Sequence, residues 1–302
     1  MANSVEDLFH YIPPIQVVDR LITEFFEQIN WRYGVPERWF RDVLQQMWSH
    51  LHHSTGNPTQ INPNWIMLLF AVIASAPPSC YEEIQHRSAL WAQLRSNDDY
   101  FMCATMARRL VEDDFLNEPN HSLMVSAADG SVLGCLATPL LCDYLAQRGR
   151  VSEAWKLAGN AIRSAESVGM HRDPEWKLWQ TMSEDEKALR RAGWWGLFIM
   201  EKYVYFVLVP SDREVNKADV CRCRICSFVL TRPQVLRTEV YNTLPYPEIN
   251  ADGTRSRFNI GQNVLIRLMG LYGDAVHKVG PGSYPLNSLT SPCFAAVQCD
   301  IP

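Results

Sequence analysis

The chain has 302 residues, of which 47% are hydrophobic and 20% are charged, and its formal net charge is −5. This composition is typical of a globular protein with a sizeable core. An acidic chain without a Lys/Arg cluster lacks the electrostatic footprint of a nucleic-acid-binding surface, and no apolar run reaches the roughly 20 residues of a membrane helix.

Nine cysteines occur in a chain with no recognisable secretion signal, which predicts free thiols. Four of them lie in apolar, helix-like surroundings and are expected to be buried: Cys80, Cys103, Cys135 and Cys142.

Apolar residues recur at helical spacing along most of the chain, and no alternating strand pattern of any length is present. The first ten residues are predicted to be disordered. The expected helices span residues 15–29, 40–51, 65–76, 81–94, 100–115, 131–148, 151–168, 183–205 and 258–279. Short turns join many of them, which favours an all-α fold of antiparallel helical hairpins packed in one domain.

The most informative stretch, residues 151–201, is predicted to form two helices around a polar elbow. Ser152 is expected to cap the first helix. That helix carries a strip of small residues against which another helix can pack closely. The strip consists of Ala154, Ala158, Ala161 and Ala165. Gly169 is expected in the left-handed conformation just past the helix end, and Pro174 prevents the helix from resuming.

The second helix opens with Ser183 and Glu186, the spacing of a capping box. Two arginines, Arg190 and Arg191, precede the apolar pair Trp194 and Trp195. The helix then stays almost wholly apolar, which predicts that it is buried.

These motifs resemble the fungal-specific transcription factor domain, the regulatory region of fungal zinc-cluster transcription factors. That family shows A-x-R-x-A-x-x-x-G-L-H-R-D, then E-x-x-x-R-R-R-x-W-W, then an L-G-R-P turn. Met170 replaces the usual Leu, and Ala192 the third Arg. The matching residues are Ala161, Arg163, Ala165, Gly169, His171, Arg172, Asp173, Glu186, Arg190, Arg191, Trp194, Trp195, Arg232 and Pro233.

The resemblance covers residues 11–279, which are therefore expected to form the regulatory domain. Residues 205–227 interrupt a helical pattern with a Cys- and Arg-rich composition, and the family has little sequence at this point. We interpret them as an insertion and hypothesise a retained intron translated in frame. Residues 280–302 are predicted to be an irregular tail, so that the domain is truncated at its C-terminal end.

The family's DNA-binding module needs six cysteines that hold two zinc ions, and the first fifty residues contain none. Cys221, Cys223 and Cys226 have metal-like spacing, but no fourth ligand lies nearby, which argues against a structural zinc site. We therefore expect no cofactor in this chain and DNA contact only through a missing or separate zinc-cluster module.

Two groups of residues could indicate catalysis. His171, Arg172 and Asp173 lie on a turn without a nucleophile beside them, so a structural role is favoured, in which Asp173 caps the elbow or pairs with Arg190 or Arg191. The acidic run suggests an alternative, an all-α enzyme of the terpene cyclase type acting on an isoprenoid diphosphate through magnesium. Its residues are Glu112, Asp113, Asp114 and Glu118. The second metal motif of such enzymes is missing.

The resemblance implies a non-catalytic regulatory domain that works in the nucleus through protein partners, a second copy or a small-molecule inducer. Two origins stay open, a stand-alone relative or a fragment whose DNA-binding exon lies upstream. A tetratricopeptide-like scaffold is a weaker alternative, because no period repeats three times.

Overall fold

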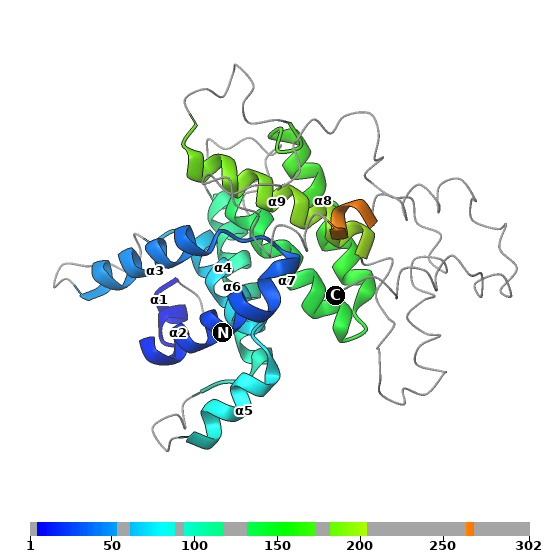
Figure 1. The fold of residues 1–302 in the computed structure, drawn as a ribbon. Coiled ribbons are helices and arrows are strands. Elements are labelled where there is room, and N and C mark those ends of the chain that lie inside the picture. The colour runs from blue at the N-terminus through cyan, green and yellow to red at the C-terminus, as the bar shows by residue number, and fades with distance from the viewer. Residues whose placement is uncertain are drawn as a thin grey trace, which may run out of the picture.

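The computed structural model describes residues 5–52, 61–87, 94–117, 132–172, 182–203 and 264–268. Within these ranges the chain is helical and contains no strand, which confirms the all-α class (Figure 1). The α-helices are α1 (Val5–Phe9), α2 (Ile15–Glu24), α3 (Glu37–His52), α4 (Pro63–Ala74), α5 (Pro78–Arg87), α6 (Asn97–Asn117), α7 (Val132–Gln147), α8 (Val151–Ser167) and α9 (Glu184–Tyr203). Residues 264–268 add a short helical turn.

The expectation of a disordered N-terminus is wrong for residues 5–10. Helix α1 forms there and contacts α6, and Leu8 is fully buried in the core. Glu6 and Asp7 lie in its first turn, where carboxylates are favoured by the helix dipole. The segment is ordered because Leu8 packs in the core. The polar residues around Leu8 do not indicate this contact.

The helix predicted over residues 15–29 changes type part-way. Helix α2 ends at Glu24, and a π-helix, η1 (Phe25–Ile29), and a 3₁₀ turn, η2 (Asn30–Arg32), follow it. The buried Asn30 side chain stops the run, because it donates to the Val35 carbonyl at 2.8 Å and accepts from the Val35 amide at 2.9 Å. Gly34, at φ 67°, makes the turn that this closure needs.

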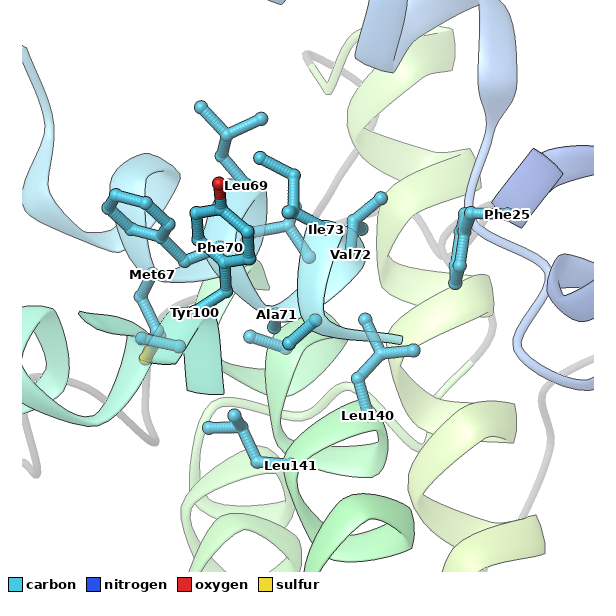
Figure 2. Packing of buried hydrophobic residues seen from close by; sticks show 14 of the residues in the cluster. Phe25, Met67, Leu69, Phe70, Ala71, Val72, Ile73, Tyr100, Leu140 and Leu141 are labelled. Atoms are coloured by element: carbon cyan, nitrogen blue, oxygen red, sulfur yellow. The ribbon is translucent and has the colours of Figure 1, made fainter. Parts of the chain in front are cut away.

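Helix α4 lies at the centre of the larger core, and every residue from Trp65 to Ala74 is buried. Figure 2 shows its side chains among Tyr100 of α6 and Leu140 and Leu141 of α7. Asn62 caps the helix by accepting from the Asn64 amide at 2.9 Å. A helix that is apolar on all sides is stable only when other helices surround it, so α6 and α7 pack against it.

Helices α7, α8 and α9 pack against one another. The small-residue strip of α8 is buried, as predicted, and the four cysteines Cys80, Cys103, Cys135 and Cys142 are buried free thiols. The prediction that Ser152 caps α8 is wrong. The helix already begins at Val151, and its cap residue Arg150 forms an ion pair with Glu153 rather than a side-chain cap.

A second, smaller apolar cluster joins α8 and α9 to the turn at residues 264–268, which lies beside them (Figure 1). Ile266 is 2% exposed and packs in this cluster with Trp194 and Ala161. The helix predicted over 258–279 is thus present at residues 264–268, and its other residues lie outside the described ranges. The proposed insertion at 205–227 and the tail at 280–302 also lie outside them.

A buried polar contact ties the N-terminal segment to α7. The Tyr33 hydroxyl donates to Asp143 Oδ2 at 2.7 Å, and Gln147 Nε2 donates to the same oxygen at 2.9 Å. Arg32 Nη1 lies 3.5 Å from it. A buried carboxylate is tolerated only when such donors compensate for its lost hydration, so this contact fixes residues 30–35 against α7.

Among the described residues, no single helix is both long and apolar enough to cross a membrane. Helices α4 and α5 taken together are long and apolar enough, but the two helices meet at a bend of 84°.

Replacing Tyr33 by Phe tests the buried polar contact. The Tyr33→Phe variant keeps the ring stack on Phe25 but removes one donor from the Asp143 carboxylate. We expect the free energy of unfolding in urea to fall by about 1–3 kcal/mol with an unchanged m-value. A Tyr11→Phe variant, whose ring faces Arg95, is the control. Equal stability of Tyr33→Phe and the unchanged protein would contradict the assigned role.

Candidate functional site

The signature elbow between α8 and α9 is built on a Schellman motif. Gly169 has φ 73°, the left-handed conformation that its position predicted. The Met170 amide donates to the Ala165 carbonyl at 2.9 Å, and the Gly169 amide donates to the Glu166 carbonyl at 3.0 Å. This pair of bonds satisfies carbonyls that the helix end would otherwise leave without partners. The turn therefore has one defined exit direction.

Met170 directs the elbow into the core. It is fully buried, and its Cε lies 2.9 Å from the position that a Cβ on Gly193 of α9 would occupy. Cys135 Cβ of α7 lies 3.5 Å from the same position. Because Gly193 has no side chain, the Met170 methyl group fills the space beside it. Met170 therefore packs between α7 and α9.

His171 lies against Trp194, with ring centroids 5.6 Å apart. Burial and the neighbouring Arg172 lower the pKa of His171, which favours the neutral ring. Among the described residues, His171 Nδ1 and Trp194 Nε1 are buried without a hydrogen-bond partner. The ring contact contributes packing, and the structural role expected for His171 stays a prediction.

The start of α9 is tied back to the end of α8. The Glu186 amide donates to Ser183 Oγ at 3.2 Å, which is one half of the predicted capping box. The Glu186 carboxylate accepts from Arg190 Nε at 3.3 Å, and Arg190 Nη1 donates to the Val168 carbonyl at 3.4 Å. Arg190 thus bridges the two helices through a backbone carbonyl at the C-terminal end of α8, where a cation is favoured by the helix dipole.

The other signature residues separate into core and surface. Trp194 and Trp195 are each 2% exposed, as their apolar helix predicted. Arg163 of α8 and Arg172 are exposed, and Arg191 is half-buried. The signature therefore combines buried core residues with exposed arginines. Asp173, Arg232, Pro233, Cys221, Cys223 and Cys226 lie outside the described residues, so their predicted roles stay predictions.

No group of three or more His, Cys, Asp or Glu side chains gathers at metal-binding distance in the part of the chain that the structure describes. The acidic run lies partly on α6. The side chains at positions 112–114 and the whole of Glu118 fall outside the described set. The metal-dependent enzyme alternative therefore gains no support from the described geometry.

A cavity of about 250 Å³ lies between the N-terminal segment and α9. Trp31, Arg32 and Tyr33 line it from the N-terminal segment, Gly196, Ile199 and Met200 line it from α9, and Leu265 also contributes. Sequence periodicity missed this site, because its residues come from three distant segments. Asp143, a charged residue within the otherwise apolar run LLCDYLA, is a sequence signal for the neighbouring contact with Tyr33 and Arg32.

Residues 8–209 match the family model of the fungal specific transcription factor domain, which is two thirds of the chain. The chain belongs to this family. The match includes the elbow, both tryptophans and the N-terminal segment beside the cavity, so the structure describes most of the family region.

Among curated proteins, the chain is 35% identical over 91 residues to the uncharacterized transcriptional regulatory protein C777.02 of Schizosaccharomyces pombe. The aligned region covers 26% of this chain and 15% of that protein. It is 26% identical over 195 residues to the equisetin cluster transcription factor eqxF of Fusarium heterosporum, covering 63% of this chain and 25% of that protein. The chain thus spans a quarter or less of the length of these relatives. No solved structure shows significant similarity to it.

The left-handed Gly169 provides a test of the elbow. Gly169→Ala places a Cβ in a conformation that costs about 1–2 kcal/mol for an L-residue, and we expect the free energy of unfolding to fall by that amount. The matched control is Gly159→Ala within α8, where the nearest atoms belong to the flexible Arg163 side chain at 3.6 Å or more. Better helix propensity should raise its stability by roughly 0.5–1 kcal/mol. Equal effects of both substitutions in urea unfolding would rule out the elbow geometry.

Proposed function

We propose that this chain is the regulatory domain of a fungal zinc-cluster type transcription factor and that it controls transcription in the nucleus. The observation that carries this proposal is the family match over residues 8–209, which spans the folded elbow and its core. The relatives that cover most of the chain are named as transcription factors and transcriptional regulatory proteins. The same match supports a regulatory rather than a catalytic role.

The charge of the chain supports indirect contact with DNA. A net charge of −5 without a basic cluster in the sequence lacks the electrostatic footprint typical of a phosphate-binding surface. We propose that a separate zinc-cluster module binds DNA. The present domain then controls the effect of that module on transcription, through protein partners or self-association.

The described geometry supports such a role because several contacts fix the end of α8 against α9. Met170, Arg190 and the Schellman bonds hold the end of α8 against α9, and Arg163 and Arg172 are exposed. A preorganised helical surface loses little conformational entropy when a partner binds.

Tethering tests this function. The 302-residue chain is fused to a heterologous zinc-cluster DNA-binding module, and a reporter gene with the matching site is measured in a fungal host. We expect reporter output to differ from that of the DNA-binding module alone, and expect Gly169→Ala to weaken the difference more than Gly159→Ala. Equal output with and without the chain, at equal nuclear amounts of the fusion proteins, would contradict the proposal.

A further inference from the structure

The backbone of the elbow fixes the position of the His171 ring. The Gly169 and Met170 amides donate to the last carbonyls of α8, and the Arg172 amide donates to the Gly169 carbonyl at 3.1 Å. His171 lies inside this closed turn, with hydrogen-bonded residues on both sides. Its ring centroid lies 5.6 Å from that of Trp194, and the two ring planes meet at 50°. The turn therefore presents the imidazole to α9.

The contact between the two rings suits a neutral imidazole. His171 Nδ1 and Trp194 Nε1 are both buried without a hydrogen-bond partner among the described residues. The indole nitrogen is a donor and cannot accept a hydrogen bond. A neutral imidazole carries a proton on one nitrogen only, whereas both nitrogens of the protonated ring are donors. Protonation would therefore leave a buried Nδ1–H next to the indole donor without an acceptor, which is costly.

The charges around the ring also disfavour protonation. Arg172, the next residue, acts on the ring together with burial, and both lower the pKa of His171. Further titratable or charged groups lie on each element of the surrounding cluster: Cys135 of α7, Glu166 of α8, Glu186, Arg190 and Arg191 of α9, and Arg267 of the turn at 264–268.

The carboxylates on these elements interact with other groups. The Glu186 carboxylate accepts from Arg190 at 3.3 Å. Glu166 interacts with Glu201 and Arg163. Among the described residues, no carboxylate therefore contributes to the pKa of His171. A positive charge on the ring would add to that of Arg172 without a compensating anion.

We propose that His171 is a pH-responsive latch of the elbow. The neutral ring packs on Trp194 and holds the turn against α9, and a proton on the ring weakens this contact. Attraction of a cation to the indole ring acts in the opposite direction. Here the desolvated Nδ1 and the adjacent Arg172 outweigh it. Acidification thus loosens the junction of α8 and α9, the bistable element that such a switch requires.

The regulatory consequence of this latch rests on the proposed function. The response to pH does not, because it is measured on the purified 302-residue chain without a reporter. Reporter tethering that fails while the pH response is found would count against the proposed function and leave the latch in place.

The test compares the unchanged chain with His171→Phe, in which a ring that cannot titrate replaces the imidazole. The unfolded chain binds a proton at this position near pH 6.5, and the folded chain binds it only at lower pH. The folding equilibrium constant of the unchanged protein should therefore fall relative to that of His171→Phe as the pH drops below about 6.5. The loss should reach up to about tenfold per pH unit until the folded ring is also protonated. Urea unfolding from about pH 7.5 to about pH 5 measures it.

His52→Phe is the matched control. His52 forms a second His–Trp ring pair with Trp48 at the end of α3, with centroids 6.3 Å apart, but His52 is exposed. Water can hydrate a proton on this ring, so His52→Phe should keep the pH dependence of the unchanged protein. A pH dependence that is the same in His171→Phe and His52→Phe would overturn the proposal.

Two measurements keep the test decisive if His171→Phe fails to fold. In the unchanged protein, the Cε1–H resonance of His171, assigned through its backbone, is followed by NMR against pH. We expect a pKa below the ordinary value of about 6.5, and a pKa at or above that value would overturn the proposal. Amide exchange of residues 165–172, corrected for its intrinsic pH dependence, should become faster as the ring is protonated. Exchange that stays constant through this titration would also overturn it.

Discussion

The close approach of α9 to its neighbours is the constraint on which the rest of the structure depends. A Cβ on Gly196 would lie 3.3 Å from Cγ of Pro139 in α7 and 3.8 Å from the Tyr33 carbonyl oxygen, and one on Gly193 would meet Met170 and Cys135. Two glycines on one helix face therefore let three separate segments touch its backbone. The loss of helix propensity that glycine brings is offset by the dispersion contacts of this packing.

The elbow and the cavity are consequences of the same approach. Because α9 lies close to α7, Met170 reaches Gly193 and fixes the exit from α8, while Trp194 and Trp195 enter the core. On the other side, Gly196 forms part of the cavity wall opposite Arg32. The elbow contact at Gly193 and the cavity wall at Gly196 both lie on α9, so the same close packing positions both.

Much of this fold follows from local sequence patterns, and the exceptions have physical causes. The left-handed Gly169, the buried alanine strip of α8 and the buried tryptophans follow from helix-end chemistry and apolar periodicity. The change to a π-helix at Phe25 and the docking of Leu8 do not, because distant packing partners decide both. The contact between Tyr33 and Asp143 joins residues 110 positions apart, and no local pattern encodes such a pairing. The predicted Ser152 cap is wrong because the helix already begins one residue earlier, at Val151.

Gly196→Val is the most direct test of the close approach, read out as the free energy of unfolding in urea with the matched variant Gly159→Val in α8. Valine has a higher helix propensity than glycine, so an unobstructed position would gain stability. At position 196 the rigid Pro139 ring and the Tyr33 backbone obstruct the side chain, and we expect a loss of about 1–3 kcal/mol that Gly159→Val does not show. Unchanged or higher stability of Gly196→Val would contradict the packing on which the elbow and the cavity both rest.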